Sequence, residues 1–282
     1  MKTLLVPVDF TPTSENTVNF AAEWSRKYEY KRIILLKTFY DSMFENLIVS
    51  AGYSNINQDN VNRQREEGRQ QLRDLCTTLS KKIDADVKVT TAISEAPLLR
   101  GIIQIIQDEN PEMIMLGTDN YNYSSGSFIA GNVISIAKAS PIRVLLVPVT
   151  DQYKPVEHAL LPYNLNMVND LERLKSLKTS PQWNNLKLHV LNFGSGNSSL
   201  KKPEKLKEAE EKFDDLLRNF EHEIHFTPEK NVITAIANFT EDHNVQLIIA
   251  LPGKHSFLYT LTHESISEAI YRNARLPVLI LK

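Results

Sequence analysis

The sequence repeats one series of apolar segments, and this internal duplication constrains the fold more than any other feature. The segment Leu4–Asp9 returns as Leu160–Asn164, Met113–Gly117 returns as Leu247–Leu251, and Val144–Val147 returns as Val278–Leu281. The prolines of the first pair lie 155 positions apart, whereas the two later pairs lie 134 apart, so the first copy is longer. Domains usually have about 100–200 residues. We therefore predict two homologous domains, at residues 1–150 and 151–282, joined by the polar linker Thr150–Pro155.

Composition narrows the class of protein. The net charge is −2, so the broad positive field of a nucleic-acid or anionic-membrane binder is not expected. No apolar run reaches the roughly 18 residues of a membrane span, and no secretory signal is recognised at Met1–Asp9. Cys76, the single cysteine, cannot form an internal disulfide and reads as a small buried hydrophobe. We therefore expect a cytoplasmic protein that binds neither nucleic acid nor membrane.

Apolar segments alternate with helical patterns along both copies. The predicted strands are Thr3–Val8, Arg32–Thr38, Asp86–Ala92, Glu112–Gly117 and Ile142–Val147, then Ala159–Leu161, Lys187–Phe193, Glu223–Phe226, Gln246–Ala250 and Pro277–Leu281. Continuous apolar runs such as Ile33–Leu36 are typical of strands that are covered on both faces. The prediction is an α/β protein with two doubly wound, five-stranded parallel sheets.

Helices are predicted between these strands. They lie near Ser14–Tyr28, Asn60–Lys82, Ala96–Glu109 and Gly131–Ala139 in the first copy, and near Val168–Leu177, Pro203–Phe220, Val232–Asp242 and Ser265–Asn273 in the second. Thr13 or Ser14 is the expected cap of the first helix. The second copy has no counterpart of segment Asp41–Asn60, which is either a packed surface excursion or a lid or partner-binding segment.

Ligands of open α/β sheets bind beyond the carboxyl ends of the strands, where the strand order reverses. The loops expected there are Asp9–Pro12 and the segment from Gly117 onward. Pro-Val-Asp at the end of the first strand, Ile-Met-Leu-Gly-Thr at 114–118 and Val-Leu-Leu-Val-Pro at 144–148 resemble the universal stress protein family in a tandem form. The resemblance implies an adenine nucleotide alpha hydrolase-like fold for each half.

Members of that family that bind ATP are expected to carry Gly-x2-Gly-x9-Gly-Ser/Thr after the fourth strand, where bare backbone approaches the phosphates. Counted from Gly117, the second glycine falls on Asn120, the third on Ala130 and the Ser/Thr position on Gly131, followed by Asn132. A Cβ at Asn120 and at Ala130 adds bulk where a triphosphate would lie. Gly131 replaces Ala130 only if the helix begins one residue later. We expect nucleotide binding to be weakened or lost.

The resemblance also implies roles for residues outside this loop. Asp9 matches the acid near the adenosine, and Thr38 matches the position whose backbone faces adenine. Asp9 has an alternative role as an Asx-type cap of the Thr11-Pro12 turn. The hydroxyl-rich segment 121–127 either donates to a phosphate or is a solvated loop. The candidate nucleotide-binding residues are thus Asp9, Thr38, Gly117, Thr118, Asn120, Gly131 and Asn132, with ATP or another adenine nucleotide as the ligand.

The second copy departs further from the motif. Asn164 stands at the position of the first-strand acid, and Leu251, Lys254 and Glu264 stand at the glycine positions, leaving Ser265 in register. A carboxylate at Glu264 would take the place of a phosphate at a helix N-terminus. We expect the second domain to be structural.

Three functions remain open at this point. The first is a non-catalytic stress or regulatory factor whose halves form an internal pseudo-dimer through the last strands, with a homodimer of the whole chain as a further option. The second is a slow nucleotide hydrolase or an AMP-forming enzyme on the same scaffold, for which Asp9, Asp119 and Lys37 are the candidate groups. The third is an interaction module that uses segment 41–60 or 121–127 and binds no small ligand.

Other constellations predict no further chemistry. His255 and His263 lack an adjacent Cys or a His-Glu-x-x-His pattern, so no metal site is expected from them. There is no Gly-x-Ser-x-Gly elbow, and no catalytic residues are predicted. Gly194-Ser195-Gly196 lacks the last glycine of a dinucleotide fingerprint, because Ser199 stands there.

Overall fold

The computed structural model describes residues 1–39, 54–119, 126–163, 185–192, 220–229, 231–251 and 275–282, with a few separate positions between 173 and 218. Residues 54–60 are described by their backbone alone. The helices predicted near 168–177, 203–220 and 265–273 fall largely or wholly outside the described residues. So do residues 41–53 of the extra segment and the glycine-containing stretch 194–196.

The ten predicted strands are all found among the described residues. They are β1 (Thr3–Pro7), β2 (Arg32–Thr38), β3 (Lys88–Ser94), β4 (Met113–Thr118), β5 (Arg143–Pro148), β6 (His158–Tyr163), β7 (Lys187–Asn192), β8 (Glu221–Phe226), β9 (Leu247–Ala250) and β10 (Val278–Ile280). The helices described are α1 (Pro12–Tyr28), α3 (Ser54–Lys82), α4 (Leu98–Glu109), α5 (Phe128–Ala139) and α8 (Val232–Asp242). The α/β class predicted from the sequence is confirmed.

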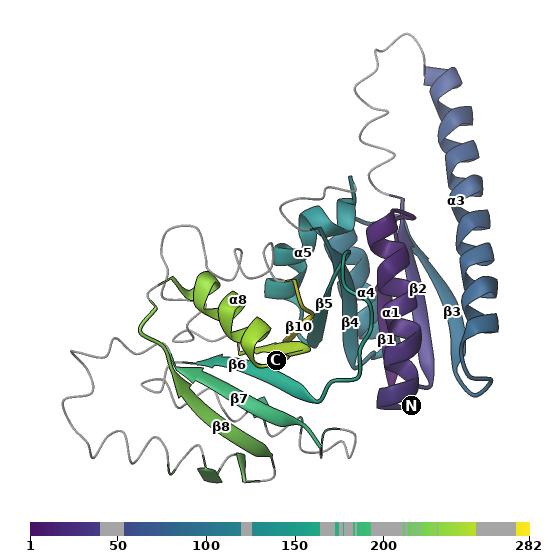
Figure 1. Ribbon diagram of the computed structural model, residues 1–282. Helices are drawn as coiled ribbons and strands as arrows, with labels where there is room; N and C mark the ends of the chain where they lie inside the picture. Colours follow the sequence, from purple (N-terminus) through teal and green to yellow (C-terminus); the bar gives the residue numbers. More distant parts are fainter. Residues whose placement is uncertain are drawn as a thin grey trace. The chain divides into compact units, whose positions relative to one another are not determined.

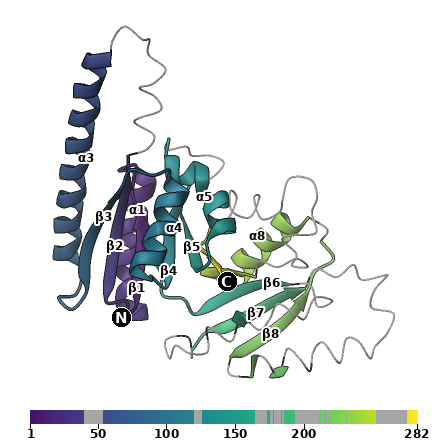
Figure 2. The same cartoon turned by 180° about the vertical axis from the view of Figure 1, so that it is seen from behind.

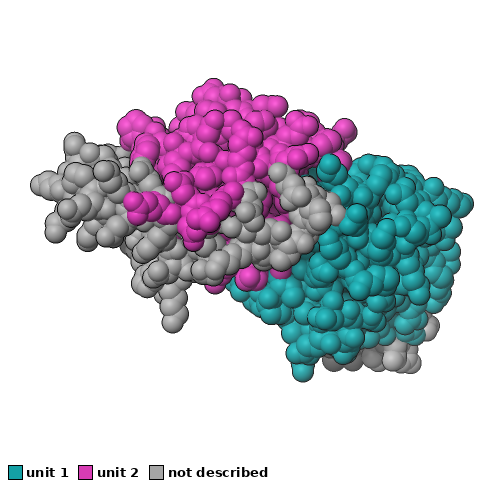
Figure 3. All heavy atoms as spheres, turned by 90° about the horizontal axis from the view of Figure 1, so that it is seen from below, with its two compact units in different colours: residues 1–119, 123–142 teal, residues 120–122, 143–282 magenta. Residues whose placement is uncertain are grey.

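Two compact units divide the described chain, one within residues 1–142 and the other within 143–282 apart from a short stretch after β4 (Figure 3). In the first unit the strand order is β3-β2-β1-β4, and the pairs are parallel. The chain moves outward from β1 through β2 to β3, and then returns to the other side of β1 with β4. The reversal of strand order therefore lies between β1 and β4, where the sequence analysis expected it.

Helices cover both faces of the first unit's sheet. α1 packs on β1 and β4 and contacts α3, whereas α4 and α5 contact each other and pack on β2 and β4 (Figures 1 and 2). β1, β2 and β4 are apolar and buried along nearly their whole length, because helices shield them on both sides. Edge strand β3 alternates exposed and half-buried residues instead.

Helix starts differ from the prediction in four places, and one of these is α4, which begins at Leu98 rather than at Ala96. α1 begins at Pro12, and its cap is Thr11, whose side chain accepts a hydrogen bond from Ser14 N; neither Thr13 nor Ser14 is the cap. α3 begins at Ser54, six residues before the predicted start, so 54–60 are helical. α5 begins at Phe128, three residues early.

The second unit has the strand order β5-β10-β9-β6-β7-β8. β6 to β10 belong to the second sequence copy and pair in parallel. β5 comes from the first copy and pairs antiparallel with β10, with Leu145 opposite Leu279. The last strands of the two copies therefore satisfy each other's edges. None of the described helices is long and apolar enough to cross a bilayer.

Candidate functional site

The first unit brings four chain segments together at the carboxyl ends of β1 and β4. The loop after β1 carries Asp9, the end of β4 carries Gly117 and Thr118, and the amino ends of α1 and α5 complete the group. Parallel strands in an open sheet place a ligand site at such a reversal of strand order. The hydrogen bonds of Asp9 determine which groups are available to a ligand at this site.

The half-buried carboxylate of Asp9 accepts hydrogen bonds from two directions. Its Oδ1 accepts from Thr11 N at 3.3 Å and from Thr11 Oγ1 at 2.6 Å, which is the Asx-type turn offered as an alternative by the sequence. Its Oδ2 accepts from Ser127 Oγ at 2.5 Å and from Ile129 N at 3.2 Å. Asp9 therefore links the turn after β1 to the first turn of α5, 120 residues along the chain.

These contacts decide the ionisation of Asp9. Burial alone would raise its pKa, but hydrogen bonds from Ser127, Thr11 and the Ile129 N–H stabilise the carboxylate more strongly, so the pKa lies below the ordinary value of 3.8. Asp9 is thus a charged acceptor at neutral pH. A negative charge beside the first turn of α5 also complements the positive end of the helix dipole.

The backbone next to Asp9 is held in an uncommon conformation. Phe10 has φ 62°, in the left-handed region that costs a bulky residue about 1–2 kcal/mol. Lys37 Nζ lies 5.2 Å from the centroid of the Phe10 ring and 5.9 Å from that of Phe39. The turn keeps this conformation because the bonds of Asp9 and the cap of α1 fix the residues on either side.

The amino end of α5 is capped by Ser127. Its side chain accepts from Ala130 N at 3.1 Å while its hydroxyl donates to Asp9. Gly131 is exposed one turn inside the helix, with no atom within 4 Å of the position that a Cβ would take, and its N–H bonds to Ser127 O. Asn132 Nδ2 donates to Phe128 O at 2.8 Å. The prediction that Gly131 and Asn132 stand at the helix start is therefore wrong, because α5 begins three residues earlier, at Phe128, after the Ser127 cap.

Gly117 is required by packing. A Cβ at this position would lie 2.5 Å from Thr17 Oγ1 and 2.8 Å from the Thr13 carbonyl oxygen, both on α1. Thr17 and Thr13 are buried, and the Thr13 carbonyl is backbone that cannot rotate away. The close approach of α1 to β4 therefore explains this glycine without any ligand.

Comparisons with known proteins agree with this architecture. The profile of the universal stress protein family matches residues 1–148. The chain belongs to the universal stress protein family. A universal stress protein from Archaeoglobus fulgidus is 17% identical with a TM-score of 0.64, covering 99% of this chain and 98% of its own. A putative universal stress protein from Pseudomonas aeruginosa is 14% identical with a TM-score of 0.57, covering 100% of this chain and 93% of its own. No curated protein matched.

The remaining family positions of the first unit are buried or outside the described residues. Thr118 is only 5% exposed at the end of β4, and Thr38 is 8% exposed beneath Gly101 of α4. Asn120 and residues 121–125 lie outside the described residues, so their role stays a prediction. The structure thus brings Asp9 to the first turn of α5, while Thr38 and Thr118 are largely enclosed by protein.

The candidate groups for hydrolysis are also engaged by the protein itself. Asp119 Oδ1 accepts from Thr13 Oγ1 at 2.6 Å, and Asp9 is bonded to Thr11 and Ser127. Lys37 lies against the aromatic rings of Phe10 and Phe39. In the second copy, Asn164, Lys254, Glu264, Ser265, His255 and His263 lie outside the described residues.

A cap signal for α5 is present in the sequence, although the predicted helix began only at Gly131. Gly126-Ser127 stands directly before an apolar helical pattern, as a helix cap does. Gly126 has φ 70°, which suits glycine, and Ser127 follows as the cap. A search for caps rather than glycine spacing would have found the start of α5.

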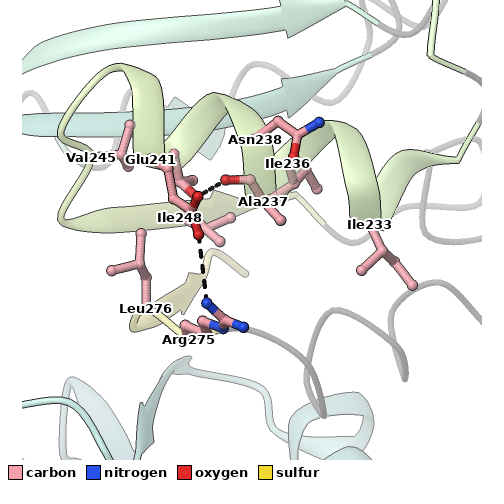
Figure 4. A pocket seen from close by; sticks show the side chains of 10 residues that line it. Ile233, Ile236, Ala237, Asn238, Glu241, Val245, Ile248, Arg275 and Leu276 are labelled. Carbon is pink, nitrogen blue, oxygen red and sulfur yellow. Dashed lines mark hydrogen bonds and ion pairs between the residues drawn. The ribbon is translucent and has the colours of Figure 1, made fainter.

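A cavity of about 470 Å³ lies in the second unit beside α8 (Figure 4). Apolar side chains such as Ile233, Ile236 and Ile248 line it. Its two charged lining residues are Glu241 and Arg275, whose Oε1 and Nη1 atoms lie 3.5 Å apart. These ten lining residues carry no set of groups that indicates a particular reaction.

Proposed function

We propose that the protein is a non-catalytic stress-response or regulatory factor of the cytoplasm in which ATP binding to the first unit is weak or lost, and in which Asp9 occupies donors at α5 instead of contacting a nucleotide as the family resemblance implied. A helix N-terminus is a ready site for a phosphate, because its free N–H groups point outward. At α5 the Asp9 carboxylate accepts from Ile129 N and from the Ser127 hydroxyl. This contact is the observation that carries the proposal.

A triphosphate does not fit well beside this arrangement. Its negative charge would lie next to an ionised carboxylate, and it would compete for donors that Asp9 already uses. Gly117, the one glycine of the motif that this chain keeps, is explained by the approach of Thr13 and Thr17. The engagement of Asp9, Asp119 and Lys37 by protein groups supports a non-catalytic role. Membership of the family supports a role in the stress response.

Calorimetric titration of the full chain with Mg-ATP tests the proposal. We expect wild-type protein to bind with a Kd no tighter than about 1 mM, giving little thermal stabilisation at equal ligand concentration. Asp9→Ala removes the competing charge and frees the donors at α5. We expect it to bind ATP about tenfold more tightly than wild type, the size of a favourable helix-terminus interaction.

Asp119→Ala is the matched control, because it removes a carboxylate bonded to α1 rather than to α5. It should leave ATP affinity unchanged, and circular dichroism should show that both variants are folded. Micromolar binding of ATP by wild-type protein would contradict the proposed loss of binding. Phosphate release that disappears in Asp9→Ala would contradict the non-catalytic role.

A further inference from the structure

Four of the seven histidines gather on one face of the second unit's sheet. His158 lies on β6, His189 on β7, His225 on β8, and His243 directly after α8, the helix beside these strands in Figure 1. The His189 ring centroid is 5.3 Å from those of His158 and His225 and 5.4 Å from that of His243. The proposed function gives this group of imidazoles no role.

Glu223 completes the group through sheet geometry. His189 and Glu223 occupy paired positions of β7 and β8. Glu223 and His225 are two residues apart on β8, so all three side chains lie on the same face of the sheet. Their ligand atoms lie within 4.8 Å of one another. His189 Nδ1 is 3.2 Å from His225 Nε2 and 3.8 Å from Glu223 Oε2, and His225 Nε2 is 3.6 Å from Glu223 Oε2.

These three separations, 3.2, 3.6 and 3.8 Å, lie within about 0.2 Å of the edges of a metal coordination tetrahedron. Ligand atoms about 2.0–2.2 Å from a tetrahedral zinc ion lie roughly 3.3–3.6 Å from each other. We propose that His189, His225 and Glu223 form a binding site for a divalent transition-metal ion of the zinc class. Three protein ligands leave the fourth position to water or another small ligand.

His158 contacts the ring nitrogen of His189 that is not part of the triangle, and so helps to orient this ring. His158 Nδ1 lies 3.0 Å from His189 Nε2, on the side of the ring opposite the proposed ion. When His189 Nε2–H donates to His158, His189 Nδ1 carries no proton and points its lone pair at the triangle. Metal-binding histidines almost always have such a partner on their second nitrogen.

Glu223 is oriented in the same way. Lys187 Nζ donates to Glu223 Oε1 at 2.6 Å, which leaves Oε2 facing the two imidazoles. Lys187 Nζ also lies 3.6 Å from Glu221 Oε1. Two carboxylates therefore surround one ammonium group, and the local charge before an ion binds is negative.

The surroundings favour a bound ion over a solvated set of side chains. The His189 side chain is 4% exposed, while Glu223 is 48% exposed and offers a path from solvent. Phe239 of α8 packs its ring edge-on to His189 and His225, with centroids 5.7 and 4.8 Å away.

The donor set selects the class of metal. Two imidazoles and one carboxylate suit zinc and its first-row neighbours, whereas Mg²⁺ and Ca²⁺ prefer sites built from oxygen ligands. The side chains come from β7 and β8, which are paired along their whole length, so the triangle is fixed by the sheet. This inference is independent of whether the first unit binds a nucleotide.

Titration of the untagged, metal-free full chain with Zn²⁺ against a chromogenic chelator tests the site. We expect one ion per chain, with no competition from millimolar Mg²⁺. Co²⁺ in place of Zn²⁺ should show the visible absorption of a tetrahedral N/O site. Glu223→Gln, an exposed change that keeps the shape of the side chain, and His225→Gln should each weaken Zn²⁺ binding at least about a hundredfold.

Control variants separate the site from general histidine binding. His222→Gln removes a histidine of the same strand that bonds Asp214 instead, and Glu221→Gln removes a neighbouring carboxylate. Both should keep Zn²⁺ affinity within about threefold of wild type, because neither residue supplies a ligand atom. His158→Gln should weaken it about 10–100-fold, as expected for loss of an orienting partner. Circular dichroism checks that each variant is folded.

Two results would overturn the proposal. One is the absence of Zn²⁺ binding at micromolar concentration by wild-type protein. The other is stoichiometric binding that survives unchanged in the folded Glu223→Gln and His225→Gln variants, because the ion would then lie elsewhere on the chain.

Discussion

Two glycines of the first unit occupy opposite environments, and each environment dictates a different response to alanine. The Cβ of Gly117→Ala would meet Thr17 Oγ1 and the Thr13 backbone oxygen. Overpacking of a rigid contact costs about 1–3 kcal/mol. We predict that Gly117→Ala lowers the free energy of unfolding by that amount, measured by urea denaturation.

Gly131→Ala is the control for this prediction. Gly131 lies in α5 with open space around its Cα, where alanine favours the helix by about 0.5–1 kcal/mol. It should leave stability unchanged or raise it. Equal losses in both variants would contradict the packing explanation of Gly117.

Asp9 makes a stability contribution that depends on pH in a defined direction. Its folded pKa lies below the unfolded value of 3.8. The contribution is therefore complete above the unfolded pKa and is lost as the pH falls through the folded pKa. We predict that Asp9→Asn lowers the free energy of unfolding by about 1.5–3 kcal/mol at pH 7, the range for hydrogen bonds to a charged group.

Urea denaturation of both proteins between pH 7 and pH 3 measures the difference. The gap should stay constant down to about pH 5 and then narrow as Asp9 is protonated in the wild type. A gap that widened toward acid would mean that burial, rather than the hydrogen bonds, controls the Asp9 carboxylate.

At the scale of the element, α5 depends on a cap that is shared with the loop after β1. Ser127→Ala removes the acceptor for Ala130 N and the donor to Asp9. Loss of an N-cap costs about 0.5–2 kcal/mol. We predict faster hydrogen–deuterium exchange in the first turn of α5, measured at 129–131 by NMR.

A double-mutant cycle with Asp9→Asn extends this prediction. Because the two side chains bond directly, their effects on unfolding should be non-additive by about 0.5 kcal/mol or more. Additive effects would show that the two groups act separately.

The strands could be predicted because their signal is local. Continuous apolar runs such as Ile33–Leu36 record burial on both faces, and each copy repeats the order. The helix starts were less predictable. Thr11-Pro12 and Gly126-Ser127 are short cap signals of two residues each. The second was missed, and α5 was predicted to begin at Gly131 instead of Phe128.

The candidate site could be predicted only in part, because its contacts join distant residues. Asp9 was identified as a site residue and as an Asx cap, but its bond to Ser127 spans 118 residues, which no spacing reveals. Gly117 was interpreted through phosphate access, whereas the atoms that require glycine belong to α1. His189, Glu223 and His225 lie on two strands, and the sheet register alone brings them together.

At the scale of the whole molecule, the two sequence copies have different local chemistry on similar sheets. The first copy places a carboxylate at the amino end of a helix, and the second gathers imidazoles over three strands. The duplicated segments that remain alike are the apolar strands, which hold the two cores. Divergence is therefore concentrated where side chains leave those cores.

The strand β10 lies between β5 and β9 in the sheet of the second unit, so its buried side chains tolerate little change. Leu279 is 2% exposed and lies between Leu145 of β5 and Ile249 of β9. A carboxylate buried there without a partner costs at least about 3 kcal/mol. We predict that Leu279→Asp lowers the midpoint of urea denaturation, whereas Arg275→Ala, whose side chain is 82% exposed, changes it little. Similar midpoints for Leu279→Asp and wild type would contradict the burial of Leu279 between β5 and β9.

The pairing of β5 with β10 also implies a delay during translation between the synthesis of β5 and that of its neighbour. β5 ends at Pro148 and its neighbour begins at Val278, so the ribosome must add about 130 residues between them. At 5–20 residues per second this takes on the order of ten seconds. During that interval the apolar edge of β5 has no native neighbour and is open to other nascent chains. Because the strand that pairs with β5 is synthesised last, we expect the nascent chain to depend on chaperones until translation ends.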